Sequence, residues 1–197
     1  MSATVIMVAS GKGGTGKSTV SVLLGSELAA RKKKTLLIEL DSGLRSVDII
    51  SGVYGKTVYD IEDILEGRCE ADKAIAESTV YPGLSVISAP YSGGHIQAET
   101  LQVITGKLAP FFDYIILDTA AGMGMPFLAA RAVSHMALLV ITPDPVTMRD
   151  GRIVSDDLWE AGVKNMRLII NRVEVGRLAK IAVKDLDTCI DTVCVQL

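Results

Sequence analysis

A glycine-rich stretch that holds two lysines and ends in two hydroxyl residues runs from Gly11 to Thr19. Such a turn gathers backbone N–H groups around an anion, and the N-terminus of a following helix adds roughly half a positive charge. Lys17 would contact the β- and γ-phosphates of a nucleotide, Ser18 would ligate Mg²⁺, and Thr19 would contact the α-phosphate. The backbone that would surround the phosphates belongs to Gly11, Gly13, Gly14, Thr15 and Gly16. The pattern predicts a P-loop that binds a nucleoside triphosphate together with Mg²⁺.

Two aspartates, Asp41 and Asp118, each come directly after a largely apolar run, at residues 35–40 and 114–117. Because parallel strands end at the same edge of a sheet, both carboxylates are expected beside the P-loop. Four apolar residues followed by an aspartate form the Walker B pattern, in which the carboxylate contacts the water shell of Mg²⁺. Ser18 and Asp118 are therefore the expected metal-binding residues.

The elements that must position these residues alternate between continuous apolar runs, typical of buried strands, and runs with helical spacing. Strands are expected at 5–9, 35–40, 84–88, 114–117, 136–141, 167–173 and 193–195. Helices are expected directly after the P-loop and at 60–65, 72–76, 98–108 and 146–161, with a further short helix after residue 176. This alternation predicts an α/β fold with a doubly wound, mostly parallel sheet and helices on both faces.

The length and composition suit one domain and exclude several classes of protein. With 49% hydrophobic residues, residues 1–197 can form one sizeable core. The formal net charge of −3 argues against a generally basic nucleic-acid binder. No apolar run approaches the roughly 18 to 20 residues that cross a bilayer, and no signal segment precedes the first strand, so a cytosolic protein is expected. Cys69, Cys189 and Cys194 are expected to be reduced thiols, because their number and spacing suit neither a disulfide framework nor a zinc site.

Lys12 is a second lysine inside the loop, which the general P-loop pattern does not require. The run Lys-Gly-Gly-Thr-Gly-Lys-Ser resembles the deviant Walker A motif of the MinD/ParA family of ATPases, which implies a P-loop NTPase fold of the SIMIBI type and ATP as the nucleotide. The resemblance also implies that Lys12 reaches across an ATP-dependent homodimer to the partner's nucleotide, as an arginine finger does. Residues 41–48 resemble switch I of the division-site branch, which implies that Asp41 orients the attacking water. Lys12, Lys17 and Asp41 are thus the expected catalytic residues.

Further positions are interpreted through the same resemblance. Asn171 and Arg172 stand where the family contacts the purine, and an asparagine amide can pair with the donor and acceptor edge of that ring. Residues 118–124 resemble switch II, although Ala120 stands where the family often has proline. Glu39 stands where the division-site branch usually has a second aspartate, and its longer side chain is compatible either with a buried structural role or with a water-mediated contact to Mg²⁺.

For function, the resemblance implies a slow, Mg²⁺-dependent ATPase, stimulated by a regulatory protein, whose ATP-dependent dimerisation switches membrane and partner binding in division-site placement. The alternative is a ParA-like partition ATPase that binds DNA non-specifically as an ATP dimer. A locally basic stretch keeps that alternative open: Arg167, Arg172, Arg177, Lys180 and Lys184. The cations of residues 31–34 either offset the negative end of the first helix or contact an anionic membrane or nucleic acid. An iron–sulfur ATPase is set aside, because no cysteine lies near switch II, between Glu70 and Thr188.

Members of the family continue beyond the strand expected at 193–195, and the division-site branch ends in an amphipathic membrane-targeting helix. The chain is therefore expected to be either a piece of a longer protein or a shortened protein with an incomplete base pocket. The full-length form is expected to be cytoplasmic and peripheral at the inner face of the cell membrane.

Overall fold

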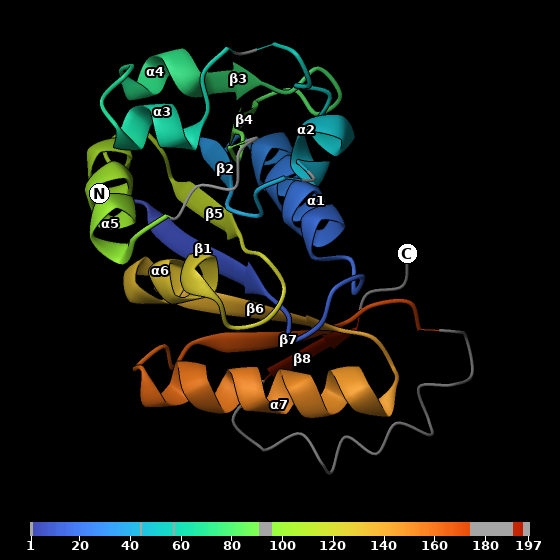
Figure 1. Ribbon diagram of the computed structural model, residues 1–197. Helices are drawn as coiled ribbons and strands as arrows, with labels where there is room; N and C mark the ends of the chain where they lie inside the picture. The colour runs from blue at the N-terminus through green and yellow to red at the C-terminus, as the bar shows by residue number, and fades with distance from the viewer. Residues whose placement is uncertain (1, 44, 57, 91–95, 174–190, 195–197) are drawn as a thin grey trace.

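The computed structural model describes residues 2–43, 45–56, 58–90, 96–173 and 191–194, and its chain alternates strands with helices (Figure 1). The strands are β1 (Thr4–Ala9), β2 (Thr35–Glu39), β3 (Ile75–Glu77), β4 (Leu84–Ile87), β5 (Tyr114–Asp118), β6 (Met136–Ile141), β7 (Met166–Ile170) and β8 (Asp191–Cys194). The helices are α1 (Lys17–Ala30), α2 (Ser46–Ser51), α3 (Ile61–Leu65), α4 (Ala71–Ala74), α5 (Ala98–Leu108), α6 (Met125–Val133) and α7 (Pro145–Glu160).

The strands form one eight-stranded sheet in the order β3-β4-β2-β5-β1-β6-β7-β8. Each neighbouring pair is parallel except β3 and β4, which are antiparallel at one edge. The register places Asp118 of β5 beside Val8 of β1 on one side and beside Glu39 of β2 on the other. The predicted mostly parallel α/β sheet is therefore confirmed, and the ends of three adjacent strands bring the predicted acidic residues to the loop that follows β1.

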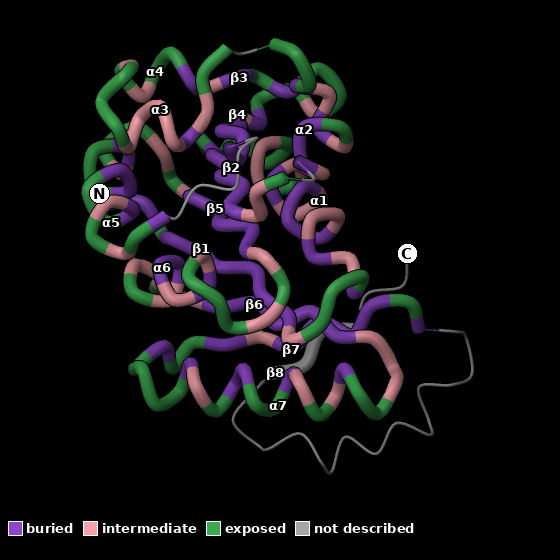
Figure 2. Tube along the Cα trace, viewed as in Figure 1, coloured by how far each residue is buried: buried purple, intermediate pink, exposed green. Residues whose placement is uncertain are grey.

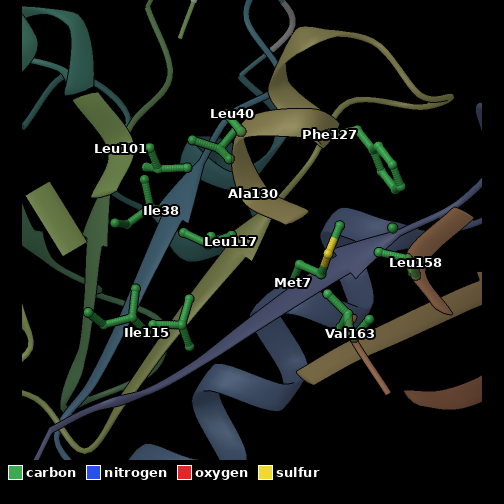
Figure 3. Packing of buried hydrophobic residues seen from close by; sticks show 14 of the residues in the cluster. Met7, Ile38, Leu40, Leu101, Ile115, Leu117, Phe127, Ala130, Leu158 and Val163 are labelled. Carbon is green, nitrogen blue, oxygen red and sulfur yellow. The ribbon is translucent and has the colours of Figure 1, made fainter. Parts of the chain in front are cut away.

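Two apolar layers cover opposite faces of the sheet. One layer packs strand residues such as Met7 and Leu117 against α3, α5, α6 and α7, and Figure 3 shows Leu117 near Ala130 of α6 and Met7 near Leu158 of α7. The other layer packs Val8 and its neighbours against α1 and α2. The central strands are buried along nearly their whole length (Figure 2), which explains why they are almost continuously apolar in sequence.

Helix α1 lies directly on the sheet at Gly25. A Cβ atom at this position would lie 2.8 Å from Cδ1 of Leu84 and 3.5 Å from Cδ1 of Ile116. Leu84 and Ile116 are both fully buried, so they could yield only by disturbing the packed core. The absence of a side chain at Gly25 therefore sets how closely the helix behind the P-loop approaches β4 and β5.

The structure corrects several boundaries. The helix predicted at 72–76 was wrong beyond Ala74, because the chain turns there into β3, where Ile75 and Ala76 pair with Ile87 and Val86 of β4. The strand predicted at 167–173 ends at Ile170, so Asn171 lies in the loop after it. Helices α2 and α6 were not predicted; they are short and follow glycine-bearing loops that resemble switch regions.

Some predictions fall outside the described residues, namely the short helix after residue 176 and the side chains of Arg177, Lys180, Lys184 and Cys189. Strand β8 overlaps the strand predicted at 193–195. Of the helices that the structure describes, none has both the length and the apolar character needed to cross a membrane.

Candidate nucleotide-binding site

The P-loop connects the central strand β1 to α1, which begins at Lys17. Gly16 precedes the helix with a φ of 96°, a left-handed conformation that glycine adopts without steric cost. The N–H groups of the first helical turn, which includes Ser18 and Thr19, have no partner within a helix and point out of its end. The loop thus has the conformation and the free backbone donors that an anion site requires.

The start of the loop contacts the elements around it. A Cβ atom at Gly11 would lie 2.5 Å from Cβ of Asp150 in α7, and one at Gly13 would lie 4.0 Å from Cβ of Ala121. The N–H of Gly122 donates to the carbonyl oxygen of Ser10 at 2.9 Å. The segment that resembles switch II therefore lies against the P-loop, and its role as a switch stays a prediction.

Lys17 is only 7% exposed and lies among carboxylates. Burial raises the pKa of Asp41, which follows β2, and the charge of Lys17 opposes part of that rise. Burial also raises the pKa of Asp118, against the hydroxyls of Ser18 and Ser21 and again the charge of Lys17. The structure thus brings together Lys17, Asp41 and Asp118, which are far apart in the sequence.

The metal-binding prediction is compatible with the donors at this position. Oδ1 of Asp118 accepts a hydrogen bond from the Ser21 hydroxyl at 2.7 Å, which orients the carboxylate. Oδ2 of Asp118 is buried and, among the described residues, has no hydrogen-bond partner, and the same holds for Oγ1 of Thr15 in the P-loop. Buried oxygens of this kind are normally satisfied. A hydrated Mg²⁺ and a phosphate chain would satisfy them, so the residues present fit both groups.

Lys12 is exposed, unlike Lys17. Its charge is close enough to act on Asp144, the N-cap of α7. Hydrogen bonds from Thr142 and Thr147 lower the pKa of Asp144 to about 2, and the charge of Lys12 adds to this effect. The two lysines of the P-loop therefore lie in different surroundings: one inside the carboxylate cluster and one on the surface.

Asn171 lies against the P-loop. It is 2% exposed, and its Nδ2 donates to the carbonyl oxygen of Thr15 at 2.9 Å. Its Oδ1 accepts the N–H of Arg172 at 2.8 Å. The amide keeps one donor hydrogen and one acceptor lone pair beyond these two bonds. Contact of Asn171 and of the exposed Arg172 with a purine stays a prediction; the structure places Asn171 against the P-loop and Arg172 directly after it.

The sequence matches the CobQ/CobB/MinD/ParA nucleotide binding domain over residues 6–193. The chain belongs to this nucleotide-binding family. Its relatives include the septum site-determining protein MinD of Synechocystis, which is 37% identical over 171 residues that make up 86% of this chain and 64% of that protein. The chain thus spans less than two thirds of the length of that curated relative.

Solved structures agree with the family assignment. The MinC:MinD cell division protein complex of Aquifex aeolicus superimposes with a TM-score of 0.85 at 32% identity, covering 96% of this chain and 79% of that one. A plasmid partition protein from Borrelia burgdorferi shares the fold, with a TM-score of 0.82 at 22% identity, over 100% of this chain and 90% of that one. The family fold thus includes division-site and partition proteins, and the relatives named MinD are the more similar in sequence.

Within this family fold, Glu39 joins β2 to α2. The residue is fully buried, and its Oε1 accepts the N–H of Val47, in the first turn of α2, at 3.0 Å. Burial raises the pKa of Glu39 to about 8; the N–H groups of Val47 and Ala89 oppose this rise, and the carboxylates of Asp48 and Asp118 add to it. The Val47 contact supports the structural alternative for this residue. A water-mediated contact with Mg²⁺ stays a prediction.

The buried carboxyl group of Glu39 should make the stability of the ligand-free protein depend on pH. Its folded pKa of about 8 lies above its ordinary value of 4.5, so the folded state holds the proton more tightly and its stabilising effect is complete below pH 4.5. This contribution is lost as pH rises towards 8, at about 1.4 kcal/mol for each pKa unit. The free energy of unfolding should therefore fall by a few kcal/mol across this range.

Urea denaturation in EDTA at several pH values measures this effect, with Glu39→Gln as the matched variant. Glutamine keeps an oxygen that can accept the Val47 N–H but does not titrate. The variant should lose a large part of the pH dependence, whereas the contributions of Asp41 and Asp118, whose pKa values are also raised, remain. An equal pH dependence in both proteins would contradict a raised pKa for Glu39.

A buried ion pair next to Glu39 was not predicted from the sequence. Nε of Arg45 lies 2.6 Å from Oδ2 of Asp48, and both side chains are almost completely buried. The hydroxyl of Ser88, after β4, donates to the other carboxylate oxygen of Asp48. The spacing of three residues between Arg45 and Asp48 is the one signal in the sequence that could have indicated the pair. These contacts tie the segment after Asp41 to the sheet.

Proposed function

We propose that the chain is the nucleotide-binding part of a Mg²⁺-dependent ATPase that hydrolyses ATP slowly and dimerises in its ATP state. The observation that carries this proposal is the cluster at the end of β1, β2 and β5, where Lys17 lies buried beside Asp41 and Asp118 at the start of α1. A P-loop lysine with two carboxylates from neighbouring strands is the donor set for a triphosphate, its metal ion and an attacking water.

Each residue of the cluster has a separate task. Lys17 would pair with the charge of the β- and γ-phosphates, and the N–H groups of the first turn of α1 would bind the phosphate oxygens. Ser18 and Oδ2 of Asp118 would hold the metal ion and its water shell. When bound, Mg²⁺ would neutralise part of the negative charge of the phosphates. Asp41 would orient the water that attacks the γ-phosphate, yielding ADP and inorganic phosphate.

Removing the carboxylate of Asp41 should separate hydrolysis from binding. In Asp41→Ala the affinity for Mg-ATP should stay within a few fold, while turnover should fall by about 100-fold or more, because general acid–base and water-orienting groups act in the transition state. Calorimetry and a phosphate-release assay measure the two quantities. The exposed aspartate of α4 offers a matched control, and Asp72→Ala should change neither. Unchanged turnover in Asp41→Ala would show that another group orients the water.

The ATP-bound dimer would then bind an anionic membrane surface and a regulatory protein, which would stimulate hydrolysis. Support comes from the relatives named septum site-determining protein and from the relative solved as a MinC:MinD complex. Co-sedimentation of the full-length gene product with liposomes of anionic lipid, in ATP and in ADP, tests this part of the proposal. ATP-dependent binding to lipid supports it.

DNA is the second candidate for the target of the ATP state. The four cations of residues 31–34 are exposed where α1 leads into β2, and the fold is shared with a plasmid partition protein. Binding to plasmid DNA with ATP, decreasing steeply as salt is raised, would favour this candidate, because counterion release dominates non-specific DNA binding. Binding to lipid and not to DNA would exclude it.

A further inference from the structure

Asn171 makes a tertiary contact that base recognition does not require. Its backbone N–H donates to the carbonyl oxygen of Ile141 at 2.8 Å, which fixes the residue to the ends of β6 and β7. Its side chain then crosses to the P-loop and donates to the carbonyl oxygen of Thr15 at 2.9 Å, over a sequence separation of 156 residues. The contact is buried, since Thr15 and Asn171 are each 2% exposed.

The amide of Asn171 also occupies the space beside Gly16. A Cβ atom at Gly16 would lie 2.3 Å from Nδ2 of Asn171. Only glycine therefore fits both the left-handed backbone and the closeness of this amide. The side-chain amide of Asn171 therefore packs directly against the backbone of Gly16.

We propose that Asn171 is a positioning residue that holds the P-loop in its phosphate-binding conformation. The C=O and N–H of a trans peptide point in opposite directions. Holding the carbonyl of Thr15 towards Asn171 therefore turns the N–H of Gly16 to the opposite side, where the loop would surround the phosphates. The glycine on one side of this peptide makes its rotation easy when the bond from Asn171 is absent. This inference rests on the proposed function, because it concerns the same nucleotide site.

The inference and simple base recognition make different predictions for a ligand without a base. Mg-tripolyphosphate carries the phosphate chain alone. If Asn171 only contacted the purine, Asn171→Ala would weaken binding of ATP and leave tripolyphosphate unaffected. If Asn171 positions the loop, the affinity for tripolyphosphate should fall as well, by about tenfold for the loss of one buried hydrogen bond, and the affinity for ATP should fall by at least as much.

Calorimetric titration of the full chain with Mg-ATP and Mg-tripolyphosphate measures these affinities. Asn171→Asp is the second variant: it can still accept the Arg172 N–H but places an oxygen against the carbonyl of Thr15, so it should lose at least as much affinity. Asn165→Ala is the control, because this exposed asparagine lies at the other end of β7. If at least one of the two variants melts within a few degrees of wild type, its loss of affinity cannot be explained by unfolding.

Hydrogen exchange of the ligand-free proteins provides a readout that does not depend on any ligand. The amides of Gly16 and the first turn of α1 should exchange faster in both variants at position 171 than in wild type. Unchanged exchange, or a loss of affinity confined to ATP, would overturn the inference. Failure of the wild-type protein to bind either ligand would instead refute the proposed function and leave the exchange result to decide the role of Asn171.

Discussion

Replacing Lys17 by alanine should abolish binding of Mg-ATP, with a loss of affinity of about 100-fold or more. The ammonium group is buried at the N-terminus of α1, where it would make charge-assisted hydrogen bonds worth about 1.5 to 3 kcal/mol. Without it, the phosphate charge would meet the carboxylates of Asp41 and Asp118 uncompensated. Calorimetric titration with Mg-ATP measures the loss.

Lys33→Ala is the matched control for the Lys17 variant, since this exposed lysine precedes β2, at the end of the strands opposite to the P-loop. The control should bind Mg-ATP as wild type does. Circular dichroism should show that both variants keep their helices and strands. Near-wild-type affinity in folded Lys17→Ala would remove the assignment of residues 11–19 as the nucleotide site.

A different result is expected for Lys12, the exposed lysine of the same loop. Lys12→Ala should still bind ATP as a monomer, but the ATP-bound dimer should be lost, and hydrolysis should disappear with it. In a sandwich of two subunits, each Lys12 would meet the partner's phosphates, so removing both leaves the two anionic faces to repel each other. A lysine that served only its own subunit would instead lower ATP affinity and hydrolysis in proportion.

Light scattering with a slowly hydrolysed ATP analogue distinguishes these outcomes. The background Asp41→Ala keeps the nucleotide intact, and Lys12→Arg tests whether a cation alone is sufficient. Lys12 lies near Asp144 in the free chain. Adding Asp144→Asn to the Lys12→Ala protein removes this negative charge without returning the lysine, so it should not restore the dimer. A Lys12→Ala protein that dimerises with ATP would refute the sandwich mechanism and leave only a P-loop nucleotide-binding domain.

The sequence was sufficient to predict the mostly parallel sheet and the glycine-rich loop between its first strand and helix, because both depend on local patterns. Buried parallel strands are continuous apolar runs, and a glycine-rich loop between a strand and a helix has few alternative conformations. Asp41 and Asp118 could be placed beside Lys17 because the ends of parallel strands meet at one edge. The short elements were predicted least well. Strand β3 has only three residues, and its pairing with β4 overrides a local preference for helix.

The contacts between distant segments could not be predicted from one sequence. The bond from Asn171 to Thr15, the Val47 N–H bound by Glu39 and the Arg45–Asp48 pair all depend on side-chain directions in the finished fold. For Glu39 the sequence left two roles open, and only burial and the contact with α2 favour one of them. Residue type and spacing thus indicate which groups reach the site, and tertiary packing determines which atoms they bind.

The close approach of α1 to the sheet at Gly25 limits how the nucleotide state can be signalled. A helix seated within contact distance of Leu84 and Ile116 has no room to slide or roll, so it cannot work as a lever when the γ-phosphate leaves. The segment that follows β2 is also held, because Val47 of α2 is buried in the core and cannot change position without breaking its bond to Glu39. The segment that follows β5 is then the one left to respond, and a partner that distinguishes ATP from ADP would have to contact it.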